Sequence, residues 1–335
     1  MHPAIDHCLR APTSAPATAT LADWLPAWQQ CVAQGTNPMA LALQGGCAAD
    51  RLAWAFGAGY QAALRALLPD SAPHELLALC LTETDGNRPR DLRCTATPLD
   101  DGRWRLHGDK RWATFGTAAT TLLVIAVRGL SPQPGGPAVA DAEGLPLPHP
   151  QLLALRVPGD APGVQLSGMP ATGLVPELPH ARLSLQQVLL PAGACLPGDG
   201  FSDYGKPFRT LEDLYVNAAV LAYLLREARA RGWPAALRER LAATLALLAS
   251  LAAAPPAAAA THVALAGALD WARQTCAEAH ALWATSPDDP AAQRWQRDVK
   301  LLGVAGAART QRAARAWERL AQAPVTRRTG AGATL

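Results

Sequence analysis

The sequence predicts an α+β protein with a helical N-terminal segment, a middle antiparallel β-barrel and a C-terminal helical bundle. Two observations predict this order. Apolar residues recur with the helical period from Leu21 to about Leu68, and again in the last third of the chain. Between these parts, short apolar runs alternate with turns rich in Gly, Pro and Asp, and no helical stretch separates them. Strands at this spacing indicate an antiparallel barrel or sandwich.

Composition and period divide the chain into five parts. The first twenty residues are rich in Pro, Ala and Thr, a composition typical of disorder. We expect a disordered N-terminal tail at 1–20, a shortened N-terminal helical domain at 21–76, a middle β-barrel domain at 77–200, a C-terminal helical bundle at 201–322 and a flexible tail at 323–335.

The N-terminal helical part closes with a long helix, DRLAWAFGAGYQAALRALLP, which Pro69 stops. The strands then follow in chain order. The first is LLALCLTE, and LRCTATPLDDGRWRLHGDKRW predicts two strands around an Asp-Asp-Gly turn. Later strands are TTLLVIAVRG, LLALRVPGDAPGVQLSG and ARLSLQQVLLP, while the Pro/Gly-rich segment 131–150 predicts a loop.

Three long helices are predicted for the C-terminal bundle. They span roughly 211–231, then 235–253 with a continuation over 258–285, and 291–321. The most apolar run, from Leu241 to Ala254, has 14 residues before Pro255 and is too short to cross a bilayer. We therefore expect no membrane span.

Charge and cysteine content exclude several classes of protein. A formal net charge of +3 and a pI near 8.5 are too mild to indicate a nucleic-acid or membrane surface. Seven irregularly spaced cysteines, with no C-x-x-C pair, argue against a disulfide framework and a zinc site. The N-terminus lacks the apolar core of a signal peptide, so we expect a cytoplasmic protein with reduced thiols and no metal.

The segment LHGDKRWATFG, from Leu106 to Gly116, holds the most informative residues. Gly108 and Asp109 predict a turn, and the residues from Trp112 onward favour a strand. The simplest interpretation is that the side chains of this hairpin pack in the hydrophobic core. Trp112 and Thr114 could alternatively form one wall of a ligand site.

These motifs resemble those of the acyl-CoA dehydrogenase family. Members of that family carry a Thr-Glu-Pro-Gly-x-Gly-Ser-Asp type loop, followed by a Gly-x-Lys-x-Trp-Ile-Thr-Asn-Gly type hairpin. Here Thr82 and Glu83 match the start of the first motif. The second is matched in step by Gly108, Lys110, Trp112, Thr114 and Gly116. The similarity extends from about Leu77 to Tyr223, with a weaker match near the C-terminus, and it implies the α–β–α fold of that family.

The resemblance implies FAD as cofactor and a specific set of contacts. In relatives the Trp of the hairpin packs on the flavin ring and the Thr bonds near its reactive nitrogen, which assigns these roles to Trp112 and Thr114. Leu79, Leu81 and Thr82 would meet the other edge of the flavin, largely through backbone groups. The implied substrate is an acyl-CoA or acyl-carrier thioester, and the implied assembly is a homodimer or homotetramer. The electron acceptor is not indicated.

The chain also departs from the family pattern. The Gly-Ser that contacts the FAD pyrophosphate in relatives is replaced by DGNRPRD, whose Arg88 and Arg90 could either neutralise phosphate or be solvated. An Arg-x-x-Phe-Gly segment that helps relatives bind FAD across subunits has no match. The C-terminal catalytic Glu of typical members has none either.

The implied reaction, α,β-dehydrogenation of an acyl thioester, needs a carboxylate base. A minority branch of the family holds it on an earlier helix, in a Leu-Glu-Arg-Leu type sequence, and RTLEDLYVNAAVLAYLL aligns Glu212 with it. Asp213 stands where those relatives have Arg. Alternatively, Thr210 caps the helix and Glu212 is only a first-turn acid favoured by the helix dipole.

Three functions therefore remain open at this level. The first is an FAD-dependent acyl-CoA dehydrogenase-like oxidoreductase with Glu212 as base. The second is a non-catalytic member of the fold, which binds flavin or acyl thioester or serves as a partner subunit. The third is a flavin monooxygenase, which does not need the base of a dehydrogenase.

Overall fold

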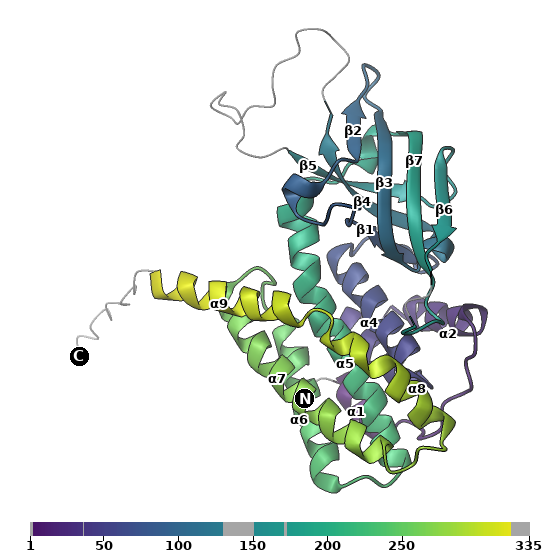
Figure 1. The fold of residues 1–335 in the computed structure, drawn as a ribbon, viewed down its shortest axis with the longest axis vertical. Helices are drawn as coiled ribbons and strands as arrows, with labels where there is room; N and C mark the ends of the chain where they lie inside the picture. Colours follow the sequence, from purple (N-terminus) through teal and green to yellow (C-terminus); the bar gives the residue numbers. More distant parts are fainter. Residues whose placement is uncertain (1–2, 36, 130–150, 171–172, 323–335) are drawn as a thin grey trace, which may run out of the picture.

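The structure, a computed structural model, describes residues 3–35, 37–129, 151–170 and 173–322. Its sheet lies at one end of the molecule and its helices fill the other (Figure 1). The long helix α5 (Lys206–Ala230) starts beside the sheet and continues through the helical part. The predicted loop at 131–150 and the predicted tail at 323–335 lie outside the described residues.

In the described part of the chain, four helices precede the sheet: α1 (Pro3–Arg10), α2 (Leu21–Ala33), α3 (Pro38–Ala48) and α4 (Leu52–Leu67). The prediction of disorder over 1–20 is wrong, because α1 buries Ile5 and Cys8 completely. Arg229 of α5 donates hydrogen bonds to the Cys8 and Ala11 carbonyls at 3.0 and 2.8 Å, which fixes the end of α1. Burial against other helices therefore overrides the disordered composition of this segment.

Among the described residues, seven strands form one sheet. They are β1 (Leu77–Cys80), β2 (Thr95–Pro98), β3 (Trp104–Thr114), β4 (Thr121–Arg128), β5 (Leu152–Pro158), β6 (Val164–Gly168) and β7 (His180–Leu190). Their order is β1-β4-β2-β3-β7-β6, and β5 pairs with β4.

The predicted sheet was wholly antiparallel, but this one is mixed. β1 and β2 both run parallel to β4, while the pairs β2–β3, β3–β7, β4–β5 and β6–β7 are antiparallel. The Asp-Asp-Gly turn between β2 and β3 forms as predicted, with Gly102 at φ +80°. Sequence period alone does not specify strand order, so it could not reveal the parallel pairs.

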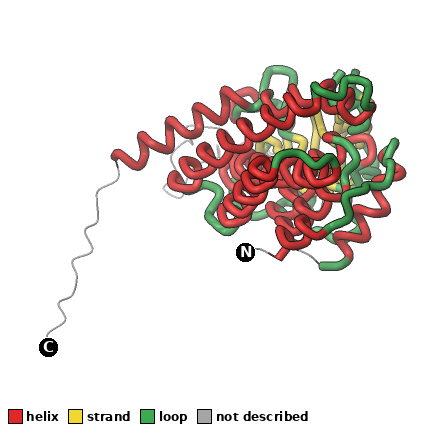
Figure 2. Tube along the Cα trace, turned by 90° about the horizontal axis from the view of Figure 1, so that it is seen from below, coloured by secondary structure: helices red, strands yellow, loops and turns green. Residues whose placement is uncertain are grey.

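After the sheet come a π-helical turn (Gly200–Gly205), α5, α6 (Ala235–Leu251), α7 (Ala259–Trp283), α8 (Pro290–Asp298) and α9 (Gly306–Gln322). The helix predicted over 291–321 is split by a 3₁₀ turn at Val299–Gly303. The C-terminal half of α9 projects beyond the other helices (Figure 2).

The N-terminal and C-terminal helices share one hydrophobic core, and a second core fills the sheet. α4 and α5 touch through their backbones. A Cβ added at Gly59 would lie only 2.5 Å from the Val216 Cα, so only glycine fits there. The same part of α4 reaches the sheet, because the hydroxyl of Tyr60 accepts a hydrogen bond from the Leu79 N–H of β1 at 3.0 Å.

Candidate functional site

The hairpin residue Trp112 sits in a β-bulge of β3. The register with β7 shifts between Lys110 and Ala113, and Trp112 takes a left-handed φ of +61°. Its side chain is 40% exposed, and the Arg111 guanidinium lies over the ring at 5.4 Å. Trp112 is therefore not buried core filler, and its indole is available to a ligand.

The turn expected at Gly108 and Asp109 does not form. β3 continues through both residues with a second bulge, between Leu106 and Gly108. Gly108 has a φ of +137°, and a Cβ there would lie 2.7 Å from the Cys94 Cα. Glycine is needed here because Cys94, just before β2, comes close to β3, and not because of a turn.

Thr114, the last residue of β3, lies directly opposite His180, the first residue of β7. Its Oγ1 is 3.3 Å from the His180 Nδ1, and its hydroxyl is also close to the Tyr60 hydroxyl. The His180 ring meets the Trp112 ring edge-on, with centroids 6.3 Å apart. Both hairpin residues therefore contact the same histidine.

Some of the backbone polar groups near Leu81 are hydrogen-bonded within the protein, and others are not. The Leu79 N–H donates to the Tyr60 hydroxyl at 3.0 Å, and the Thr82 carbonyl accepts from the Arg111 N–H at 2.9 Å. Within the described residues, the N–H groups of Leu81 and Thr82 have no hydrogen-bond acceptor. Leu81 is only 6% exposed, so an unpaired donor here is costly unless a ligand or water accepts from it.

A buried ion pair fixes this segment. The Lys110 Nζ lies 2.6 Å from the Glu83 Oε1 and 3.5 Å from the Leu81 carbonyl oxygen. Glu83 also accepts hydrogen bonds from the N–H groups of Arg93 and Cys94, at 2.6 and 3.1 Å. The lysine of the hairpin motif is thus a structural residue that ties β3 to the chain after β1.

Glu212 lies in α5 and faces the same region. α5 begins at Lys206, so Glu212 is in its second turn, and the capping interpretation of Thr210 is wrong. The Thr210 Oγ1 instead lies 3.4 Å from the His262 Nε2. Within the described residues the side chain of Glu212 makes no hydrogen bond or ion pair, and its carboxyl group is near enough to Tyr60 to interact electrostatically.

The carboxyl of Glu212 is poised to hold a proton near neutral pH. Glu212 keeps intermediate surface exposure, but its carboxyl group lies deep among protein atoms. Loss of solvation, with a smaller contribution from the charge of Asp213, raises its pKa to about 7, although Arg309 and Arg209 oppose the shift.

Asp213, which stands where the aligned relatives have Arg, joins α5 to α9. Its carboxylate pairs with Arg309 at 2.7 Å and with Arg312 at 2.5 Å, both from α9, and is 7% exposed. The α9 arginines therefore hold α9 on α5 and place positive charge near Glu212.

The two loop arginines do not reach the hairpin. Arg88 is exposed, and Arg90 is 73% exposed with a loose pair to Asp91 at 3.7 Å. Beside the hairpin, a cavity of about 290 Å³ is instead lined by Thr84, Asp109, Lys110, Arg111, Met169 and Arg182. Within the described residues, neither Arg111 nor Arg182 has a carboxylate partner.

Sequence reasoning missed Tyr60 and His180. Tyr60 is buried in a helix of small and apolar residues, and His180 lies 66 positions from Thr114. Neither belongs to a motif, so no local signal distinguishes them. The structure also brings Leu79, Thr114 and Glu212 around the Tyr60 hydroxyl.

No protein-family model and no curated protein sequence matches this chain. Solved structures do match it. Butyryl-CoA dehydrogenase from Megasphaera elsdenii matches with a TM-score of 0.59 and 16% identity over 84% of this chain and 81% of that one. A glutaryl-CoA dehydrogenase from Mycobacterium smegmatis in complex with FADH2 matches with a TM-score of 0.57 and 15% identity over 97% and 94%.

The chain has the acyl-CoA dehydrogenase fold. FMN-bound TdsC from Paenibacillus is also similar, with a TM-score of 0.65 and 15% identity over 95% of this chain and 98% of that one. The acyl-CoA dehydrogenase fold predicted from the hairpin motif and the α–β–α order is therefore confirmed. In this instance of the fold, none of the helices within the described residues is long and apolar enough to span a bilayer.

Proposed function

We propose that this chain is a flavin-dependent oxidoreductase that oxidises an acyl thioester at its α and β carbons, with FAD as cofactor and Glu212 as base. The observation that carries the proposal is that Glu212 and the predicted flavin residue Thr114 both interact with Tyr60, Glu212 through its charge. The Tyr60 hydroxyl contacts the Leu79 N–H and lies near both Thr114 and Glu212. The base and the flavin wall thus share one junction between α5 and the sheet.

The residues at this junction fit a flavin ring. Trp112 offers a half-exposed aromatic surface, and Thr114 offers a fixed hydroxyl. The N–H groups of Leu81 and Thr82, which have no acceptor among the described residues, would donate to the polar edge of the ring. A flavin site needs this combination of a flat wall and a few fixed polar partners.

The phosphate end of the cofactor would be held differently from the family pattern. Arg111 and Arg182 line the cavity beside Trp112 and have no carboxylate partner among the described residues. We assign the flavin phosphates to these arginines rather than to Arg88 and Arg90, since planar guanidinium groups bind phosphate well. Tighter binding of FMN and FAD than of riboflavin would support this assignment.

Glu212 would remove the α-proton of the thioester. A bound flavin supplies the acceptor for the hydride that leaves the β carbon. A base works best when its pKa is close to the operating pH, and the pKa of about 7 meets that condition. Burial raises the pKa of Glu212, while the charges of Arg309 and Arg209 oppose a larger shift.

The proposal is tested on purified protein. We expect yellow protein, release of FAD on denaturation, and bleaching of the visible band by at least one acyl-CoA in a chain-length panel. Glu212→Gln should retain flavin and acyl-CoA binding but lose about 10²–10⁴ in reduction rate. Glu239→Gln, at an exposed acid in α6, is the control and should not change the rate. Equal reduction rates in both variants would rule out Glu212 as base.

Two other outcomes would point to the other functions. Flavin that no acyl-CoA reduces would favour the non-catalytic binding or partner-subunit function. Flavin that is reduced only by an external reductant and then consumes oxygen would favour a monooxygenase. A structure of TdsC with FMN and indole has the same fold, with a TM-score of 0.61, which makes that outcome worth measuring.

Assembly and location complete the proposal. We propose a homodimer or homotetramer, because large apolar side chains of α7 and α9 are exposed: Trp271 at 56%, Trp317 at 61% and Leu320 at 40%. We also propose a cytoplasmic location, on the sequence argument from seven irregularly spaced cysteines.

A further inference from the structure

His180 contacts both residues assigned to the flavin wall. Its Nδ1 lies 3.3 Å from the Thr114 Oγ1, and its ring meets the Trp112 indole edge-on at 6.3 Å and 71°. The register explains the arrangement, since Thr114 and His180 are a cross-strand pair at the end of β3 and β7.

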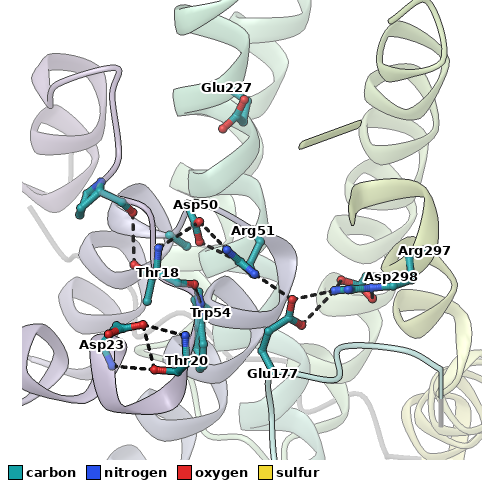
Figure 3. Close-up of polar contacts among 12 residues, drawn as sticks. Thr18, Thr20, Asp23, Asp50, Arg51, Trp54, Glu177, Glu227, Arg297 and Asp298 are labelled. Carbon is teal, nitrogen blue, oxygen red and sulfur yellow. Dashed lines mark hydrogen bonds and ion pairs between the residues drawn. The ribbon is translucent and has the colours of Figure 1, made fainter. Parts of the chain in front are cut away.

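The chain that leads to His180 is held from two directions. Glu177 accepts from Arg51, the residue just before α4, at 3.0 Å and from Arg297 of α8 at 2.9 Å (Figure 3). The Val175 N–H donates to the Asp298 Oδ1 at 2.8 Å. Burial acts to raise the pKa of Glu177, but the hydrogen bonds from Arg297 and Arg51 outweigh it and hold that pKa below its ordinary value.

The backbone of His180, the first residue of β7, is also fixed. The His180 carbonyl accepts from the Met169 N–H at 2.8 Å, at the end of β6. With the Glu177 pairs three residues earlier, this bond leaves the His180 backbone little freedom. A side chain on so rigid a backbone can orient its neighbours.

Thr114 and Trp112 both need orientation to serve a ligand. A threonine hydroxyl hydrogen rotates unless a partner selects its direction. Trp112 projects from a bulge with 40% exposure, so its indole loses freedom when a ligand covers it. A side chain that hydrogen-bonds the Thr114 hydroxyl and packs against the Trp112 ring orders both groups in advance. It therefore reduces the conformational entropy that they lose when a ligand binds.

We infer that His180 is a positioning residue of the flavin site, which orients the Thr114 hydroxyl through Nδ1 and supports the Trp112 ring through its edge. The inference rests on the proposed flavin site. His180 acts through its two neighbours, so its two contacts have separable effects. Support of Trp112 governs affinity for the ring, and the bond to Thr114 governs the electronic environment of the flavin.

Two variants separate the contacts. His180→Phe keeps a ring against Trp112 but removes the bond to Thr114. His180→Asn keeps a polar atom near the place of Nδ1 but removes the ring. FAD and FMN are titrated into each apoprotein by flavin fluorescence, and the visible spectrum and reduction potential of the bound flavin are recorded. His107→Ala, which removes an exposed histidine from the same strand β3, is the matched control.

We expect His180→Asn to weaken FAD binding about three- to tenfold, the effect of leaving one large side chain to be ordered on binding, with a wild-type spectrum. We expect His180→Phe to bind with near wild-type affinity but with a shifted visible band and potential. Unfolding midpoints confirm that each variant is folded. A spectrum and affinity unchanged in both variants would overturn the inference while the flavin proposal stands. Wild-type protein that binds neither FAD nor FMN would overturn both.

Discussion

The buried pair of Lys110 and Glu83 gives the sharpest quantitative prediction. The Lys110 side chain is 0% exposed and the Glu83 side chain 7%, with the charged atoms 2.6 Å apart. Removing one partner of such a pair typically costs about 3–5 kcal/mol, because the other charge stays buried without compensation. Glu83 would still accept two backbone hydrogen bonds, so we expect Lys110→Met to cost about 3 kcal/mol, the lower end of the range.

The assay is urea unfolding followed by far-UV circular dichroism, on the apoprotein and with FAD. Glu83→Gln removes the charge that compensates Lys110 and replaces one acceptor oxygen with an NH2 group that cannot accept from a backbone N–H, so its cost should be similar. The double variant removes both charges and should cost clearly less than the sum of the singles, with a coupling of about 2 kcal/mol or more. Flavin affinity should fall in both singles, since the pair holds the chain that carries Leu81 and Thr82.

Asp6→Asn is the matched control. Asp6 pairs with Arg10 in α1, but the two side chains are 55% and 79% exposed, so its loss should change stability little or not at all. Costs below about 1 kcal/mol for both singles, or strictly additive costs in the double variant, would refute the reasoning about the buried pair.

The other predictions concern the flavin wall, the base and the assembly. Trp112→Ala should lose bound FAD yet shift the unfolding midpoint little, because the side chain is 40% exposed; a large loss of stability with normal flavin content would contradict this. The pKa of Glu212 is raised to about 7 from 4.5, so its stabilising effect is complete below about pH 4.5 and is lost as pH rises through 7. Glu212→Gln should therefore flatten the decline in stability between pH 5 and pH 8, and an unchanged slope would show that the carboxyl is solvated. Light scattering at micromolar concentration should give a dimer or tetramer, and Trp317→Glu should shift it toward monomer; a monomeric wild type would disprove the assembly.

Local patterns predicted the elements well where the physics is local. Pro69 does lie just beyond the end of α4 at Leu67, and the Asp-Asp-Gly turn does join β2 to β3. A proline cannot continue a helix, and a glycine with positive φ suits a tight turn, whatever the rest of the chain does. The hairpin motif likewise predicted the fold that the solved structures confirm.

The same local reasoning was wrong where packing decides. The first twenty residues have the composition of a disordered tail, yet Pro3–Arg10 forms α1 because the shared helical core buries Ile5. Gly108 is a typical turn residue, yet β3 continues through it, and it lies where Cys94, just before β2, comes close to β3. Composition describes a residue, whereas burial depends on what the fold brings next to it.

For the candidate site too, some features could be predicted from the sequence, while others depend on the fold. The resemblance of the motifs predicted which residues would meet a flavin: Leu79, Leu81, Thr82, Trp112 and Thr114, with Glu212 as the aligned acid. The folded chain adds three contacts that the motifs do not predict: Lys110 is buried against Glu83, Tyr60 interacts with Thr114 and Glu212, and His180 touches both Trp112 and Thr114. The pKa of Glu212 was also decided there, since solvation and the charges of Asp213, Arg309 and Arg209 depend on distance in space. A motif records side chains at fixed spacing along one strand, but these contacts join α4, α5 and β7 to that strand, and no spacing along the chain encodes them.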